Sequence, residues 1–174
     1  MILNRKCIVG FALLTALCFS LSSARAAEPW KGNTVARPVE AVLMSGLSIY
    51  GNEAAFGVLT GGAYLLKDRH FVGEIDNRVW AEVLLGPAFF STTNSTLTGF
   101  QYSAHARWDV NYNEIWTAYA IAGLSGYQLP DRLGGSFTVH PRVALGVKYQ
   151  TKSALLLRGE VSAEFIGAGV ALNF

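Results

Sequence analysis

Three residues of one alternating stretch carry the side chains of a nucleophile, a base and an acid. Ser103, His105 and Asp109 are separated by even numbers of positions, so an extended chain places all three on one face. In acyl-transfer enzymes a histidine removes the proton of such a serine, and a carboxylate orients the imidazole. On one strand, however, Ser103 and His105 lie about 6.8 Å apart, beyond direct hydrogen-bond reach for their backbone positions. We therefore assign no catalytic residue, although a triad could still be assembled from separate strands.

The histidines and cysteines do not form a metal-binding motif. His70, His105 and His140 lie far apart in the sequence, and Cys7 and Cys18 are the only cysteines. Zinc sites normally use closely spaced pairs of these residue types. We therefore expect neither a metal ion nor another cofactor, and we interpret His105 and His140 as members of a hydrogen-bond network.

The first 26 residues have the three-part layout of a secretory signal peptide. MILNRK supplies two positive charges, the apolar run CIVGFALLTALCFSLSS follows, and Ala24-Arg25-Ala26 has the small-x-small pattern of a cleavage site. An uncleaved membrane anchor is the alternative, because the apolar run is near the minimum length of a transmembrane helix. A lipoprotein signal is a further alternative, but it would need a small residue before Cys18, where the sequence has Leu17.

Cleavage after residue 26 would change the charge and the redox chemistry of the mature chain. The count of basic residues would fall from 14 to 11 while all 12 acidic residues remain, so the formal charge would become about −1. No basic surface would remain to attract nucleic acid, which we exclude as a partner. Both cysteines would leave with the signal, so we expect no disulfide framework.

Beyond the signal, the sequence changes to short strand-like runs separated by turn residues. Residues 27–38, AEPWKGNTVARP, form a polar lead-in with two prolines, which we place in the periplasm. No later run has the roughly 18 apolar residues that a second membrane helix would need. Each run is close to the roughly 9 to 11 residues with which a tilted strand crosses a bilayer. The eight predicted strands are Val39–Tyr50, Ala55–Leu66, Val79–Phe90, Phe100–Asn111, Ile115–Tyr127, Phe137–Tyr149, Ala154–Ser162 and Phe165–Phe174.

The faces of these strands separate a membrane barrel from a water-soluble one. A soluble barrel buries its apolar face, whereas a membrane barrel turns that face toward lipid. Along residues 100–111, one face is apolar and aromatic, and the other carries His105, Arg107 and Asp109. Such a polar face is too charged for a dry soluble core. The same alternation recurs in the first, third, sixth and seventh runs, while the second and fifth are too rich in alanine and glycine to assign.

Charged residues on the polar faces are balanced in sign. An eight-stranded barrel is just wide enough to be filled by side chains, so these groups should plug the lumen rather than line a wide channel. Equal numbers of positive and negative charges are expected in such a lumen, because an unpaired buried charge is costly. The predicted lumen network contains Arg107, Arg142, Lys148 and Arg158 against Glu40, Glu82, Asp109 and Glu160, together with His105 and His140.

Aromatic residues are predicted to collect at both ends of the barrel. Transmembrane barrels carry aromatic girdles at the two membrane interfaces. With the N-terminus in the periplasm, the periplasmic rim would hold Trp108, Tyr112, Trp116, Tyr149 and Phe174, and the outer rim Phe89, Phe100, Tyr127, Phe137 and Phe165.

The chain resembles the small outer-membrane β-barrels of Gram-negative bacteria, of the OmpA and OmpX type. The resemblance rests on the signal peptide, the eight amphipathic strands and the apolar row in the last strand. The resemblance covers about residues 39–174 and is one of architecture. It implies an all-β, eight-stranded, antiparallel up-and-down transmembrane barrel in the outer membrane. The implied function is a structural or surface-interaction role in the cell envelope, and the implied partners are outer-membrane lipid and lipopolysaccharide around a monomer.

In that family the alternating final strand with its terminal aromatic is read by the outer-membrane assembly machinery. The resemblance implies the same role for Ile166, Ala168, Val170, Leu172 and Phe174.

Two alternative functions remain open. Some small outer-membrane barrels modify lipid A as deacylases or acyltransferases, and the deacylases use a His-x-Ser pair. Here His105 is followed by Ala106-Arg107 and His140 by Pro141-Arg142, so neither histidine has that pattern. The other alternative is a secreted ligand-binding barrel resembling lipocalins, which would require an apolar interior.

Overall fold

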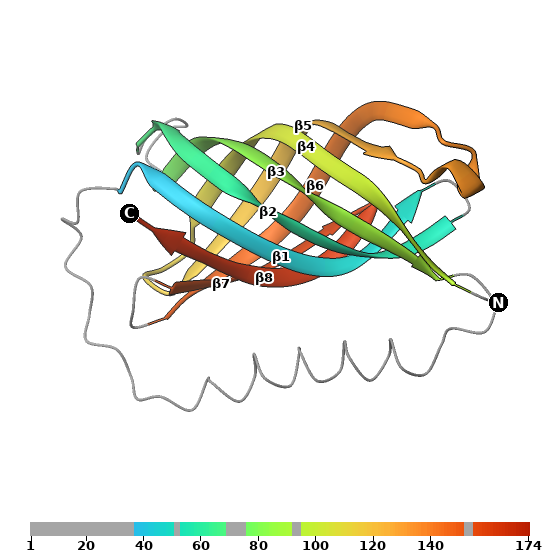
Figure 1. Ribbon diagram of the computed structural model, residues 1–174. Coiled ribbons are helices and arrows are strands. Elements are labelled where there is room, and N and C mark those ends of the chain that lie inside the picture. The colour runs from blue at the N-terminus through green and yellow to red at the C-terminus, as the bar shows by residue number, and fades with distance from the viewer. Residues whose placement is uncertain (1–36, 51–52, 69–75, 92–94, 152–154) are drawn as a thin grey trace. The chain divides into compact units, whose positions relative to one another are not determined.

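A computed structural model gives the structure of residues 37–50, 53–68, 76–91, 95–151 and 155–174. Within these ranges eight strands form one closed antiparallel barrel, in which each strand pairs with the next and β1 pairs with β8 (Figure 1). The strands are β1 Val39–Tyr50, β2 Glu53–Lys67, β3 Asn77–Ser91, β4 Thr96–Asn111, β5 Trp116–Gln128, β6 Phe137–Gln150, β7 Leu155–Ser162 and β8 Phe165–Asn173; a short 3-10 helix, η1, covers Asp131–Leu133.

The fold class and the strands predicted from the sequence are confirmed. β1 has the predicted bounds, and the other strands differ from the prediction by at most four residues at either end. The largest difference is at β4, whose first residues pair with the end of β3 in a hairpin. The predicted signal peptide and all but the last two residues of the lead-in lie outside the described residues.

The two ends of the barrel differ in their connections. We call the end that holds the start of β1 and the connection between β4 and β5 the turn end. There Asn113 Oδ1 accepts hydrogen bonds from the backbone N–H groups of Ile115 and Trp116, at 2.9 and 2.8 Å. This contact stabilises a tight reversal, as expected of asparagine in a turn. The opposite end, which holds η1 between β5 and β6, is the loop end.

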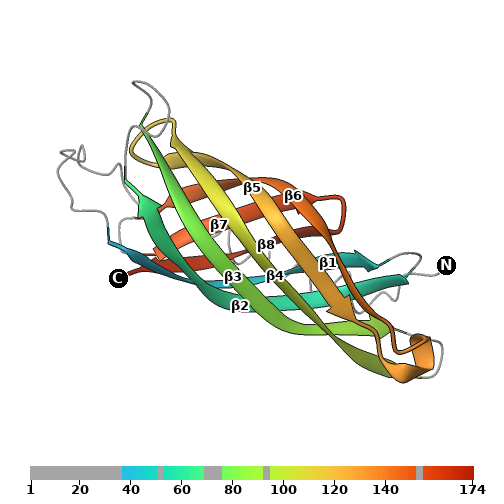
Figure 2. The same ribbon diagram turned by 90° about the horizontal axis from the view of Figure 1, so that it is seen from above.

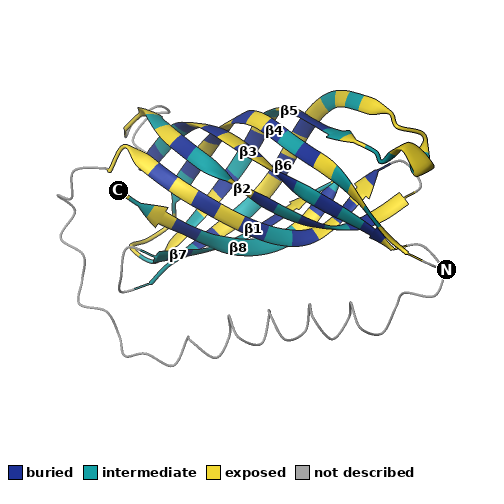
Figure 3. Ribbon diagram, viewed as in Figure 1, coloured by how far each residue is buried: buried dark blue, intermediate teal, exposed yellow. Residues whose placement is uncertain are grey.

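Residues alternate between the lumen and the outer surface along every strand (Figure 3). In β4, His105, Arg107 and Asp109 are buried, while Phe100 and Trp108 are exposed. The outer surface is apolar over most strands, whereas the interior contains charged residues. The exposed large apolar residues include Leu43, Leu47, Ile49, Val83, Leu85, Leu124, Val139, Val143, Leu145, Val147, Val161, Ile166 and Leu172.

The two strands whose faces could not be assigned from sequence, β2 and β5, supply large side chains to the lumen. Leu59 of β2 packs in a cluster with Met44 and Leu84. Tyr119 and Ile121 of β5 are both buried. The interior is therefore layered, with apolar clusters beside the charged groups.

Two of the aromatics predicted at the outer rim lie at that end of the barrel but point into its lumen, so placing them in an aromatic girdle facing lipid was wrong. Phe165 is buried, and Tyr127 contacts the ring of Tyr50 with 4.4 Å between centroids. The cause is the period of two along a strand, because Tyr127 shares its face with the lumen residue Ser125, and Phe165 shares its face with the buried Ala171. Phe100 and Phe137 are exposed at the loop end, and Trp108, Tyr112, Trp116 and Phe174 are exposed toward the turn end.

Closure of the barrel depends on a close approach of β1 and β8. Gly46 is paired with Gly167, and a Cβ atom on Gly46 would lie 2.2 Å from the Ile166 carbonyl oxygen. Gly46→Ala is therefore expected to lower the free energy of unfolding by about 1 to 3 kcal/mol, because a strand backbone must shift. Urea unfolding of the protein in lipid vesicles measures this difference in the free energy of unfolding. Gly159→Ala is the control, since its Cβ would meet only Val147 Cγ2 at 3.8 Å; equal effects of the two changes would contradict the prediction.

Candidate functional site in the barrel lumen

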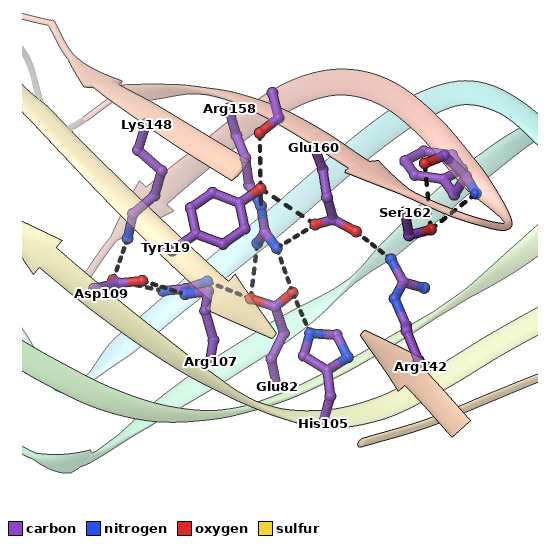
Figure 4. A network of polar contacts seen from close by, with 12 residues as sticks. Glu82, His105, Arg107, Asp109, Tyr119, Arg142, Lys148, Arg158, Glu160 and Ser162 are labelled. Atoms are coloured by element: carbon purple, nitrogen blue, oxygen red, sulfur yellow. Dashed lines mark hydrogen bonds and ion pairs between the residues drawn. The ribbon is translucent and has the colours of Figure 1, made fainter. Parts of the chain in front are cut away.

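Ten polar side chains from six strands meet in the lumen, and Figure 4 labels all of them except Glu40. They come from strands far apart in sequence because alternate residues of every strand point to the barrel axis. The set is Glu40 from β1, Glu82 from β3, His105, Arg107 and Asp109 from β4, Tyr119 from β5, Arg142 and Lys148 from β6, and Arg158 and Glu160 from β7. All but Tyr119 were among the lumen residues expected from the sequence.

Glu82 accepts hydrogen bonds from three cationic or aromatic partners. Arg158 binds it with both terminal nitrogens, Nη1 to Oε2 at 2.7 Å and Nη2 to Oε1 at 2.8 Å. Arg107 Nη1 donates to the same Oε2. His105 Nε2 lies 2.9 Å from Oε1. Both carboxylate oxygens are thus fully used, and two guanidinium groups share one anion.

Arg107 links the Glu82 group to the turn end of the lumen. Its Nη1 and Nη2 donate to the two oxygens of Glu40 at 2.7 and 3.0 Å, and its Nε donates to Asp109 Oδ1 at 2.9 Å. Lys148 Nζ donates to Asp109 Oδ2 at 2.5 Å. The indole ring of Trp80 lies 5.1 Å from the Arg107 guanidinium carbon. Ionic and cation–π contacts together surround this side chain.

Glu160 extends the network toward the loop end. It accepts from Arg158 Nη2 at 2.9 Å and from Arg142 Nη2. The Tyr119 hydroxyl accepts from Arg158 Nε at 2.9 Å, and its ring lies 4.7 Å from the Arg158 guanidinium carbon. Arg158 therefore donates hydrogen bonds to two carboxylates and contacts one aromatic ring, and its Nη1 lies 3.9 Å from Glu40 Oε1.

The charges of this network compensate one another within the barrel. Its four cationic residues meet four carboxylates, and all eight are less than 6% exposed. Burial of a single ion in such a place would cost several kcal/mol, and only close partners with satisfied hydrogen bonds offset the cost. The arrangement can hold neighbouring strands in register and fill the lumen.

A second polar cluster lies nearer the loop end and contains the remaining predicted histidine. Ser125 Oγ donates to Glu164 Oε2 at 2.7 Å, and His140 Nε2 lies 2.7 Å from Glu164 Oε1 and 3.1 Å from Ser125 Oγ. One imidazole nitrogen therefore faces both partners, and the carboxylate accepts the hydrogen bond of the serine hydroxyl. A hydrolytic triad instead needs the carboxylate on the other imidazole nitrogen. The contacts form a hydrogen-bonded ring of three side chains and differ from the serine–histidine–carboxylate order of such a triad.

Ser103, His105 and Asp109, whose spacing first suggested a triad, make other contacts in the structure. His105 contacts Glu82 rather than Ser103, and Asp109 is bound by Arg107 and Lys148. Within the described residues, Ser103 Oγ and His105 Nδ1 are buried without a hydrogen-bond partner. The structure thus brings these residues into the lumen without assembling a catalytic set.

Sequence reasoning missed four residues of these clusters, namely Trp80, Tyr119, Ser125 and Glu164. Trp80 and Tyr119 are large lumen residues, but Tyr119 stands in a run of small residues and Trp80 beside a predicted lipid face. Glu164 was assigned to a connection between strands. The one signal available was parity, because Trp80 shares its face with Glu82.

The described residues contain no cluster of three or more His, Cys, Asp or Glu side chains that could bind a metal ion. No helix in the described part of the chain is long and apolar enough to cross a membrane.

Comparisons with known proteins yield only distant structural similarity. No protein-family model matches the chain, and no curated protein matches it. Two solved structures of Ail, the attachment invasion locus protein of Yersinia pestis, align with 78% of this chain and 97% of theirs at 11% identity. The TM-scores are 0.44 for the complex with the heparin analogue sucrose octasulfate and 0.42 for Ail alone. Because these values are low, the fold assigned to this chain rests on its own strand pairing.

Proposed function

We propose that the chain is an integral outer-membrane β-barrel with a structural or surface-interaction role in the cell envelope. The observation that carries this proposal is the inverted polarity of the closed barrel, with paired charges inside and large apolar side chains outside. Water would leave that outer surface exposed, whereas a bilayer would cover it. A lipocalin-like carrier would need an apolar calyx, and buried Arg107, Arg158 and Glu82 occupy that place.

The lumen contents favour a plugged barrel over a wide channel. Ion pairs cross the interior from Lys148 to Arg142 (Figure 4). A cavity nearer the loop end measures about 10 Å³, which is room for roughly one water molecule. The proposed role therefore depends on the outer surface and rims. A lipid-modifying activity remains the second candidate, and the ring of Ser125, His140 and Glu164 gives it little support.

Targeting and assembly complete the proposal. Residues 1–26 would direct export and be cleaved, and the lead-in would lie in the periplasm. The assembly machinery would read Ile166, Ala168, Val170, Leu172 and Phe174, which alternate with lumen-facing residues of β8. The mature protein would be a monomer surrounded by outer-membrane lipid and lipopolysaccharide.

Cell fractionation combined with gel mobility tests this proposal. We expect the protein in the outer-membrane fraction and a lower apparent mass for unboiled than for boiled samples, because the closed barrel stays compact in detergent. A soluble periplasmic protein without a mobility difference would overturn the proposal. Lipid A of unchanged mass after incubation with the purified protein would leave the enzymatic alternative without support.

A further inference from the structure

An apolar layer fills the loop end of the lumen. Tyr50 of β1 contacts two other rings there, with centroids 5.8 Å from Phe90 of β3 and 4.4 Å from Tyr127 of β5. We call this layer the apolar cap; it consists of Tyr50, Ala55, Ala88, Phe90, Leu97 and Tyr127. The cap therefore takes side chains from five consecutive strands, β1 to β5.

A polar layer lies beneath the apolar cap. The Tyr50 hydroxyl and Ser48 Oγ both donate to Gln101 Oε1, the latter at 2.9 Å. Ser48 and Gln101 also line the small loop-end cavity together with Arg142. Ser48 is 1% exposed and lies one lumen position deeper than Tyr50 on β1. The cap thus separates Ser48 from the loop-end opening of the barrel.

The connection between β5 and β6 packs against the apolar cap. Its Leu129 and Leu133 are half-buried, and both contact the cap residues. Its backbone hydrogen bonds join its own residues, since Leu133 donates to the Pro130 carbonyl at 2.8 Å and Leu129 donates to the Ser136 carbonyl at 2.9 Å. We call residues 129–136 the lid, and Figure 2 shows it in orange at the end of the β5–β6 hairpin.

Two glycines give the lid its fold. Gly134 and Gly135 have φ angles of 101° and 58°, in the left-handed region that favours glycine. There the chain turns back from η1 toward β6. A Cβ atom added to Gly134 would meet no described atom within 4 Å beyond its chain neighbours. A side chain at this position would therefore strain the backbone of the lid without touching the rest of the barrel.

We infer that the lid controls the access of water-soluble molecules to the loop-end part of the lumen. Two half-buried leucines and its own turns hold it in place, whereas each strand beneath is held by a hydrogen-bonded ladder. Segments with few apolar contacts open locally at a much lower free energy than the whole fold. Opening withdraws Leu129 and Leu133 from the apolar cap and uncovers the way to Ser48. In the proposed orientation, this opening faces the cell exterior.

Thiol labelling at residue 48 tests the lid. Ser48→Cys places a thiol beneath the apolar cap by the change of a single atom. The protein, purified in detergent micelles, is treated with a charged, water-soluble methanethiosulfonate, and the mass of the peptide that contains residue 48 gives the rate. This rate follows the population of open lid when the lid closes faster than the thiol reacts. We expect Ser48→Cys to react at least about a hundredfold more slowly in the folded than in the urea-unfolded protein.

Two lid variants, each combined with Ser48→Cys, should speed the labelling. Gly134→Ala places a side chain on a left-handed backbone, and Leu133→Ser removes one of the two apolar anchors. Each is expected to raise the labelling rate about tenfold, because the closed lid is destabilised and the open lid is not. Circular dichroism and the heat-dependent gel shift confirm that each variant is folded, and either variant alone decides the test.

Matched controls repeat the same changes away from the lid. Gly159→Ala adds a methyl group that would meet only Val147 Cγ2 at 3.8 Å, and Leu66→Ser alters a leucine that is 59% exposed toward the turn end. Both should change the labelling rate by less than about twofold. Rapid labelling of Ser48→Cys alone, or equal rates in the lid variants and the controls, would overturn the lid. Failure of the proposed function would appear separately, as a soluble protein without a gel shift, on which the same labelling can be measured in buffer.

Discussion

Replacing Glu82 with glutamine is expected to lower the free energy of unfolding by about 3 to 5 kcal/mol. Glu82 is 1% exposed and is the shared anion of Arg107 and Arg158, with His105 as a further partner. An amide keeps the shape but removes the negative charge, so two guanidinium groups would face each other around a neutral group. Loss of one partner of a buried ion pair costs far more than loss of an exposed pair, because the remaining charge stays desolvated.

Urea titration of the protein refolded into phosphatidylcholine vesicles measures this effect. Glu53→Gln is the matched control, because Glu53 is exposed at the start of β2. We expect the control to change the free energy of unfolding by less than about 0.5 kcal/mol. A loss below about 1 kcal/mol for Glu82→Gln, the range of an exposed pair, would show that the lumen network contributes little to stability.

Val83→Arg is expected to destabilise the barrel by about 2 to 4 kcal/mol in a bilayer. Val83 is 53% exposed on the outer surface and lies near the middle of β3. In the proposed orientation that position contacts the hydrocarbon centre, where a guanidinium loses its hydration. On the surface of a water-soluble protein, the same exposed substitution would change stability by roughly 0.5 kcal/mol at most.

Phe100→Arg supplies the depth control for Val83→Arg. Phe100 is 42% exposed and lies toward the loop end of the outer surface. Because the cost of an arginine falls to about 0 to 1 kcal/mol near the interface, this variant should be much less affected. Similar costs at the two positions would argue against a membrane around the barrel.

Much of the fold could be predicted because alternation is a local signal. In β4 the sequence sets Phe100 and Trp108 on one face and His105 and Arg107 on the other, and the structure follows that division. A single strand therefore contains the information about its own lumen side. The balance of charges across strands similarly indicated that the polar faces meet.

The partners of each charge could not be predicted, since they depend on registers between strands far apart in sequence. Lys148 Nζ contacts Glu40 Oε2 at 3.4 Å across 108 positions. The pairing also shows that β7 ends before β6 does, because β6 pairs with β7 only from Ala144 to Gln150. Weak alternation explains the missed Tyr119, whose neighbours in β5 are mostly small.

The central claim is that the apolar outer surface of this barrel faces lipid while its charged face fills the lumen. Nitroxide labels on cysteines introduced singly at Ala104, Ala106 and Tyr112 test it most directly in bilayers. All three residues are exposed on the described structure, the first two within β4 and the third beyond its turn end. We expect oxygen collisions to dominate at Ala104 and Ala106, and collisions with a water-soluble nickel complex to dominate at Tyr112. Dominance of the nickel complex at all three positions would contradict the account.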